Sequence, residues 1–176
     1  MLTLRIHIPS LILGLALGAL LLFAQGRFLK SAHEFRADFI SGQGERACRL
    51  DGFGGAETGA RGPMRWSFGP EASIQFFVPV PEMRRELVLT YKLISPIPDQ
   101  DLEVVFNGKV VSRLSSLPAS PDWSRWYGES VTLAPQLGPN TLSFRVSRWN
   151  GHQGSIAPED DRPLALMFQD LTIFPQ

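Results

Sequence analysis

The octapeptide VVFNGKVV at positions 104–111 is the feature that most limits how this chain can fold. Two β-branched runs flank Asn107 and Gly108, and this dipeptide accepts the positive φ angles that a two-residue turn between antiparallel strands requires. A second turn sequence, LGPNT at positions 137–141, introduces another run suited to a strand. The pattern therefore predicts antiparallel strands connected by tight turns.

Runs of the same kind recur from residue 48 onward, and fourteen prolines and sixteen glycines are available for the connections. In the clearest run, Leu87, Leu89, Tyr91 and Leu93 would share one face of a strand. Eight strands are predicted, at residues 64–68, 73–80, 86–94, 102–106, 109–114, 129–133, 141–149 and 164–174. They predict an all-β domain at residues 45–176, an antiparallel two-sheet sandwich. A jelly roll is the preferred topology, and an immunoglobulin-like strand order is the alternative that the pattern also allows.

The stretch IPSLILGLALGALLLFAQG, residues 8–26, contains no charged side chain. As a helix it would be about 28 Å long, close to the hydrocarbon thickness of a bilayer. Because Arg5 precedes the apolar run, residues 1–26 are predicted to form a single transmembrane signal-anchor helix, with a cleaved signal peptide as the alternative. Gly14 and Gly18 would leave a small-residue face against which a partner helix could pack.

The following segment, RFLKSAHEFRADFIS at 27–41, has apolar residues at helical spacing. We predict an amphipathic juxtamembrane helix that ends in a short hinge, so that the linker covers residues 27–44. Phe28, Phe35 and Phe39 would then contact the membrane surface or a partner. The alternative is a continuation of the anchor helix whose apolar face packs on the β domain.

The last predicted strand, LALMFQDLTIF, is apolar on both faces at its start, which is typical of a central strand covered on both sides. Gln169 and Asp170 interrupt the alternation and indicate a β-bulge. Asp161 and Arg162 directly precede this strand, and we interpret them as a structural lock that fixes the entering loop through a salt bridge and backbone hydrogen bonds.

No group of residues has the spacing of a catalytic, cofactor or metal site. The three histidines are far apart in sequence and the single cysteine has no cysteine partner, so no metal-ligand pattern is present. His152, Ser155 and Asp160 are near one another, but without a nucleophile elbow they are interpreted as parts of an exposed loop. The 17 basic and 17 acidic residues give no basic excess for nucleic acid. We expect a protein that is not an enzyme, with no cofactor, no metal and no nucleic-acid partner.

Aromatic side chains at strand ends are the remaining candidates for binding. Trp66 lies within a predicted strand and is assigned to the core. Trp123, Trp126, Tyr127 and Trp149 lie at strand ends or in loops, where they could stack on a glycan or insert into a protein partner. Covering the open edge of the sandwich is the alternative role for these four residues.

Four segments occur in an order that resembles a known class of module: GFGGAETGARGPMRWSFGPEASIQFFV, VVFNGKVV, LGPNTLSFRVS and DDRPLALMFQDLTIFP. They look like the extracytoplasmic β-sandwich modules attached to bacterial membrane glycosyltransferases and envelope polysaccharide proteins. The likeness covers most of residues 50–176 and implies a bacterial inner-membrane location with a periplasmic β domain. Against this, Arg27, Lys30 and Arg36 follow the apolar run and would favour a cytoplasmic domain. The catalytic part of those proteins is absent, so the resemblance implies no activity.

Three hypotheses about function follow from these observations. The first hypothesis is a non-catalytic, membrane-anchored accessory subunit whose β-sandwich braces or assembles a larger membrane protein complex, which could be photosynthetic, respiratory, transporting or polysaccharide-making. Its partners would be the subunits of that complex and the lipid bilayer. The alternative is a glycan-binding module of envelope polysaccharide synthesis or export. An enzyme with an unrecognised loop site is a third hypothesis.

Overall fold

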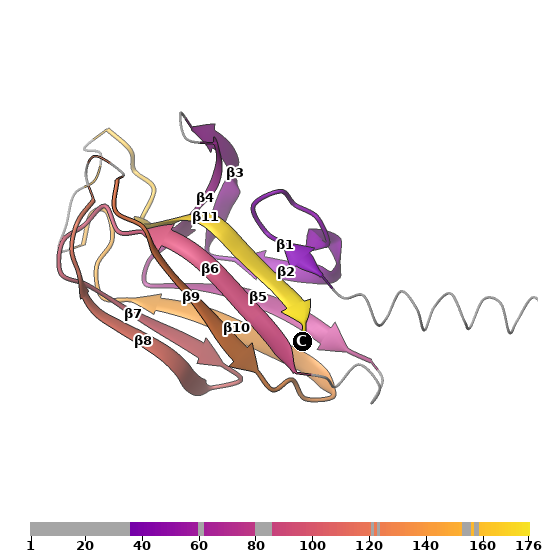
Figure 1. Cartoon of the computed structure of the whole chain (residues 1–176). Coiled ribbons are helices and arrows are strands. Elements are labelled where there is room, and N and C mark those ends of the chain that lie inside the picture. The colour runs from indigo at the N-terminus through magenta and orange to yellow at the C-terminus, as the bar shows by residue number, and fades with distance from the viewer. Residues whose placement is uncertain are drawn as a thin grey trace, which may run out of the picture. The chain divides into compact units, whose positions relative to one another are not determined.

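The computed structural model describes residues 36–59, 62–79, 86–120, 122, 124–152, 156 and 159–176. Over these residues the chain is an all-β sandwich of two antiparallel sheets (Figure 1). The predicted anchor at 1–26 and most of the predicted amphipathic segment, with Gly14, Gly18, Phe28 and Phe35, lie outside the described residues. No helix within the described ranges has the length and hydropathy needed to cross a bilayer.

The first sheet, sheet A, has the strand order β3-β4-β11-β6-β9, and β1 pairs with the C-terminal part of β11. Its strands are β1 (Ala37–Asp38), β3 (Phe53–Gly59), β4 (Gly62–Phe68), β6 (Leu87–Ile94), β9 (Tyr127–Leu133) and β11 (Leu164–Pro175). The second sheet, sheet B, has the order β2-β5-β10-β7-β8. It consists of β2 (Cys48–Asp51), β5 (Glu71–Val78), β7 (Gln100–Phe106), β8 (Lys109–Leu117) and β10 (Gly138–Val146), and the short 3-10 helix η1 (Glu45–Ala47) precedes β2.

The strand order confirms the predicted sandwich and gives it the topology of a jelly roll. Strands β4, β11, β6 and β9 face β5, β10, β7 and β8, so the chain changes sheet at almost every connection. The β7–β8 hairpin is the connection that stays within a sheet in this part of the chain. Its turn has φ angles of 48° at Asn107 and 80° at Gly108, as the sequence predicts.

Strand β11 lies in the middle of sheet A, between β4 and β6. The first five residues of β11 are all buried, which confirms that both of its faces are covered at its start. The register with β6 shifts between Phe168 and Asp170, and this shift confirms the predicted β-bulge at Gln169–Asp170. The bulge turns the side chain of Asp170 out of the apolar series that precedes it.

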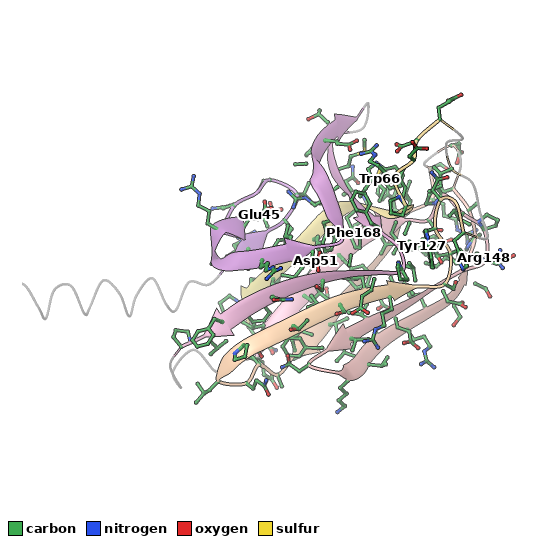
Figure 2. All side chains as sticks on the ribbon, turned by 180° about the vertical axis from the view of Figure 1, so that it is seen from behind. Glu45, Asp51, Trp66, Tyr127, Arg148 and Phe168 are labelled. Carbon is green, nitrogen blue, oxygen red and sulfur yellow. The ribbon has the colours of Figure 1, made fainter. Side chains whose placement is uncertain are left out.

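The main core fills the space between the sheets. Tyr91, Phe144 and Phe168 are almost fully buried there and make edge-to-face contacts, with ring centroids 5.2 Å apart for Phe144 and Phe168 and 6.1 Å apart for Tyr91 and Phe144. Phe168 lies near the centre of the domain (Figure 2). A second, smaller cluster of Trp66, Ile94, Leu164 and Met167 lies apart from this core. Trp66 is therefore a buried residue, as predicted.

The described part of the predicted helix and hinge at 27–44 has a different structure. Ala37 and Asp38 form β1, and Phe39 N–H donates to the Leu171 carbonyl. Asp38 Oδ1 accepts hydrogen bonds from the backbone N–H groups of Ile40 and Ser41, a local arrangement that competes with helix formation.

Phe39 is consequently not a surface contact, because it is fully buried with Ala37 and Ile40 in the main core. The helical spacing of the apolar residues was misleading since pairing with β11 overrides it. The sandwich thus includes residues that precede the predicted boundary at residue 45.

The buried position of Phe39 can be tested by truncation. Phe39→Ala is expected to lower the free energy of unfolding by about 3–5 kcal/mol, because it leaves a cavity in the core. The matched control is Phe77→Ala, whose aromatic side chain is 61% exposed and whose loss should change stability by about 0.5 kcal/mol or less. Denaturant unfolding of the full-length chain in detergent, followed by tryptophan fluorescence, measures both. Equal effects would contradict the core assignment.

Candidate functional site

A shallow groove of about 510 Å³ lies across the outer face of sheet A. Its floor consists of two rows of paired residues on three neighbouring strands. Lys92 of β6 lies between Gly128 of β9 and Asp170 of β11. In the second row, Thr90 of β6 pairs with Ser130 of β9. These side chains point outward because they alternate with Leu89, Tyr91 and Leu93, which face the core.

Trp126 forms one end of this groove. Its half-buried ring packs against the smaller apolar cluster around Trp66 and Met167, which fixes the indole in place. The Lys92 ammonium lies 5.1 Å from the Trp126 ring centroid, within the range of a cation–π interaction. Apolar side chains thus pack against one side of the indole, and on the groove side it meets the exposed, charged side chain of Lys92.

The polar groups beside Trp126 are available to a ligand. The hydroxyl groups of Thr90 and Ser130 make no hydrogen bond to other described residues, and Asp170 uses one carboxylate oxygen to accept a hydrogen bond from Thr172. Gly128 contributes no side chain, so the groove stays open next to the indole. The arrangement combines one aromatic face with hydroxyl, ammonium and carboxylate groups.

Tyr127 is among the residues that border this groove, but its side chain points the other way. Its ring packs against the main core, and its hydroxyl is buried without a hydrogen-bond partner in the described part of the chain. Arg125 covers the ring with its guanidinium carbon 5.7 Å from the centroid. The predicted stacking role of Tyr127 is therefore wrong, because the strand alternation of β9 directs this side chain inward while Trp126 and Gly128 face outward.

Trp149 also has a structural environment. Its ring stacks on His152 with centroids 4.1 Å apart and planes inclined by 22°. A Cβ atom on Gly69 would come within 2.4 Å of the indole, so Trp149 requires glycine at that position. His152 and Gly69 thus lie against the Trp149 ring, so this ring offers less free surface for stacking on a ligand than Trp126 does. Trp123, the remaining aromatic candidate, lies outside the described residues.

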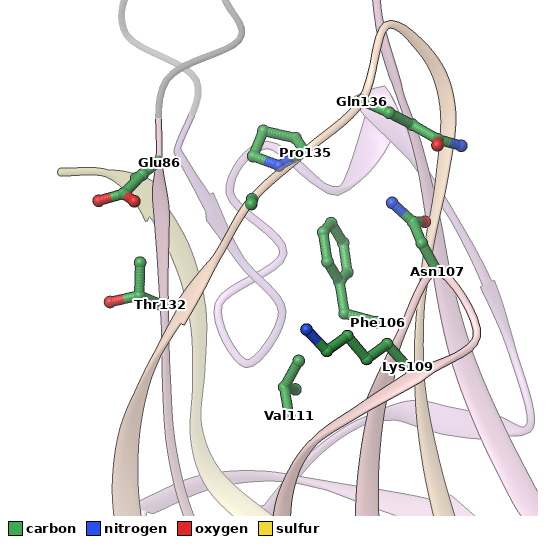
Figure 3. A pocket seen from close by; sticks show the side chains of 9 residues that line it. Glu86, Phe106, Asn107, Lys109, Val111, Thr132, Pro135 and Gln136 are labelled. Atoms are coloured by element: carbon green, nitrogen blue, oxygen red, sulfur yellow. The ribbon is translucent and has the colours of Figure 1, made fainter.

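A second depression of about 510 Å³ opens at the side of the sandwich, between the ends of β8 and β9. Figure 3 shows the Phe106 ring in its middle, with Lys109 reaching toward the side that carries Thr132 and Glu86. The Phe106 ring is only 5% exposed and stacks on Phe76, so it offers little aromatic surface.

The amide side chains of this cleft are engaged in the fold. Asn107 donates to Asn140 Oδ1 at 2.9 Å and accepts the Thr141 N–H, while Gln136 Nε2 donates to the Pro139 carbonyl. Asn140 is almost fully buried and connects the two turns through these bonds. The cleft is therefore a less favourable ligand site than the groove around Trp126.

The structural lock before β11 is present, but Arg162 pairs with Asp160 and not with the predicted Asp161. Arg162 donates from Nη2 to Asp160 at 2.7 Å and from Nη1 to Glu57 of β3 at 2.7 Å. Asp161 is exposed and does not take the predicted place beside Arg162. The two-residue separation lets Asp160 Oδ1 accept both the backbone N–H and the Nε–H of Arg162, a geometry that an adjacent residue cannot match.

No cluster of metal-ligating side chains occurs within the described ranges. His152 stacks on Trp149, and the Asp160 carboxylate is held by Arg162, so these two side chains are engaged separately. Ser155 lies outside the described residues.

Comparison with known proteins adds a distant structural likeness. No protein-family model matches the chain, and no curated protein matches its sequence. The C-terminal CBM6 of LamC, a marine laminarinase from Zobellia galactanivorans, has a TM-score of 0.44 at 12% identity, over 80% of this chain and 98% of that one.

Two family 35 carbohydrate-binding modules are similar to the same extent. The module from Clostridium thermocellum has a TM-score of 0.45 at 11% identity, and the module from Paenibacillus barcinonensis has 0.43 at 12%; each match covers 80% of this chain and 98% of the other. Since all three TM-scores are below 0.5, they assign neither a ligand nor a function.

Of the residues that border the groove, Trp126 and Tyr127 are the site candidates predicted from the sequence. Thr90, Lys92, Ser130 and Asp170 are not among those candidates, because they come from three strands that are distant in sequence. The alternation in the sequence places Thr90 and Lys92 on the opposite face of the strand from Leu89, Tyr91 and Leu93. What could not be foreseen is the strand order that places β9 and β11 on either side of β6.

The lock gives a pH-dependent prediction. Hydrogen bonds from Arg162 hold the pKa of Asp160 below its ordinary value of 3.8, so the folded state keeps this carboxylate charged at lower pH than the unfolded state does. The stabilisation is therefore present above about pH 4 and is lost as the pH falls further. Asp160→Asn should lower the melting temperature at pH 7 in low salt, and this deficit should shrink between pH 4 and pH 3.

Asp161→Asn is the matched control and should leave the melting temperature unchanged at each pH. An equal effect of the two substitutions, measured by circular dichroism on the full-length chain, would contradict the assignment of Asp160 as the partner of Arg162.

Removal of the Tyr127 hydroxyl and removal of the Tyr91 hydroxyl should have different effects on the free energy of unfolding. Tyr127→Phe removes an unpartnered buried hydroxyl and is expected to leave the free energy of unfolding unchanged or raise it by about 1 kcal/mol. Tyr91→Phe removes the hydrogen bond to Glu129 Oε2 at 2.8 Å and should lower it by about 1–2 kcal/mol. Denaturant titration of both variants tests this difference, and a clear loss of stability in Tyr127→Phe would show that its hydroxyl has a partner.

Proposed function

We propose that this chain is a non-catalytic glycan-binding module, held by an N-terminal anchor at the bacterial inner membrane with its β domain in the periplasm. The observation that carries the proposal is the half-buried Trp126 at the end of an open groove with hydroxyl groups on its floor. The sequence resemblance to modules of envelope polysaccharide proteins agrees with this choice.

The chemistry of the groove suits a sugar ring. The apolar C–H face of a pyranose can stack on the Trp126 indole, whose orientation is already fixed by the cluster beneath it. Sugar hydroxyl groups act as donors and acceptors, and Thr90, Ser130, Lys92 and Asp170 supply both kinds of partner. Because Lys92 lies near the ring, the ligand must move this side chain or bind its ammonium. The groove is open and shallow, which favours a segment of an extended chain over a small enclosed ligand.

Binding can be tested with three soluble oligosaccharide classes, neutral, N-acetylated and uronic-acid-containing, titrated into the full-length chain in detergent. Trp126→Ala should weaken binding by about tenfold or more, since truncation of a central aromatic contact costs about 2 kcal/mol. Ser130→Phe should act similarly, because it fills the groove from an exposed strand position. Phe77→Ala is the control for loss of an exposed aromatic residue and should bind normally.

Binding of no oligosaccharide class, or equal affinity of Trp126→Ala and the unchanged protein, would refute the proposal. Melting temperatures of each variant exclude unfolding as the cause of a loss.

A bracing accessory subunit is the second candidate function. It is favoured by three large apolar side chains that are exposed in the described part of the chain, Phe77, Val110 and Leu137, which a protein partner could cover. Purification from the native membrane in mild detergent tests it. A stoichiometric partner that is lost when Gly14 and Gly18 are both replaced by leucine would support this candidate, and a chain that purifies alone would count against it.

A further inference from the structure

Among the described residues, three large hydrophobic side chains are exposed: Phe77 at 61%, Leu137 at 47% and Val110 at 42%. We call these residues the apolar rim. Phe77 lies one residue before the end of β5, and Leu137 directly precedes β10. Val110 follows the turn between β7 and β8. All three residues thus lie at strand ends or next to turns.

Strand pairing places the three rim residues at one end of the sandwich. Gly138 pairs with Val78, which brings Leu137 to the end of β5, and Thr141 bonds to Asn107 at the β7–β8 turn. The three rim residues therefore lie at the same end of sheet B.

The chain also enters the domain at this end. Only Gly69 and Pro70 separate β4 from β5, so β5 starts at the end of the sandwich where β4 stops. Because β11 is antiparallel to β4, it also starts there, and β5 and β11 both finish at the rim end. Ala37 pairs with Ile173 near the end of β11, which puts Arg36 at the rim end (Figure 1).

The length of the preceding chain limits how far this end can be from a membrane. Nine residues, 27–35, separate the uncharged stretch 8–26 from Arg36. Even fully extended they reach only about 30 Å. With residues 8–26 in the bilayer, Arg36 at the rim end can lie no more than about 30 Å from the lipid surface. This step rests on the membrane anchor in the proposed function.

We propose that the apolar rim contacts the bilayer and docks the β domain on the membrane surface. Phe77 and Leu137 would insert among the lipid headgroups, as apolar side chains of interfacial proteins do. The exposed Lys109, next to Val110, can meet lipid phosphate groups. Two short apolar contacts suffice because the anchor already holds the domain at the surface.

This docking would also set the direction of the groove. Leu133, at the end of β9, pairs with Leu87 at the rim end, so Trp126 before the start of β9 lies toward the opposite end. The docked domain therefore presents the Trp126 end of the groove away from the bilayer.

Site-directed spin labelling of the full-length chain in liposomes containing zwitterionic and anionic phospholipids tests the proposal. In a Cys48→Ala background, labels at Phe77→Cys and Leu137→Cys report on the rim, and labels at Gln75→Cys and Arg145→Cys are controls. Gln75 is exposed two residues from Phe77 on the same face of β5, and the exposed Arg145 pairs with Glu71 at the far end. Collisions with a water-soluble nickel chelate should be several-fold slower at 77 and 137 than at 145, with an intermediate rate at 75.

A second variant guards against an effect of the label itself. With the label at 137, Phe77→Asp should raise the nickel collision rate toward that of position 145, while Gln75→Asp should leave it unchanged.

The possible results distinguish failure of the rim proposal from failure of the proposed membrane anchor. A chain that resists carbonate extraction but shows equal nickel access at 77, 137 and 145 would overturn the rim and leave the anchor in place. A chain that carbonate releases would overturn both. Protection in native membranes but not in pure lipid would assign the rim to a protein partner and overturn the lipid contact.

Discussion

The central position of β11 is the constraint on which the rest of the sandwich depends. This strand pairs with β4 over its first half, with β1 near its end and with β6 along most of its length. It also supplies Phe168 and Leu166 to the main core, while Leu164 and Met167 belong to the second cluster. Both apolar clusters and sheet A thus share one strand, so a change in its register would disturb all three at once.

The bulge at Gln169–Asp170 connects this strand to the candidate site. Before the bulge, β11 is buried on both faces, as an apolar central strand must be. After it, Asp170 joins Lys92 and Gly128 in a polar row on the outer face. One inserted residue therefore marks the change from the Trp66 cluster to the groove. Trp126 lies at this boundary, with apolar packing on one side and polar groups on the other.

Sequence patterns predicted much of this architecture. All eight predicted strands are present, and the Asn107–Gly108 turn and the bulge occur where local chemistry required them. The missed strands, β1, β2 and β3, are short or rich in glycine. Strands β1 and β2 also pair with strands that are distant in sequence, whereas β3 forms a hairpin with the adjacent β4. The same limitation applies to the site. Trp126 could be recognised as an aromatic residue at a strand end, whereas the groove beside it exists only once β6 lies between β9 and β11.

The attachment of β1 to β11 has a mechanical meaning. Any pull that reaches the domain through Arg36 acts first on a two-residue strand and on the buried side chains of Ala37, Phe39 and Ile40. Behind them, the bidentate pair between Glu45 and the buried Arg65 holds the remainder of the loop on β4. A force applied there would act on the buried side chains of Ala37, Phe39 and Ile40 and on the Glu45–Arg65 ion pair before it acted on the longer paired strands. Residues 36–47 are therefore the part of the described domain that any force from the preceding chain meets first.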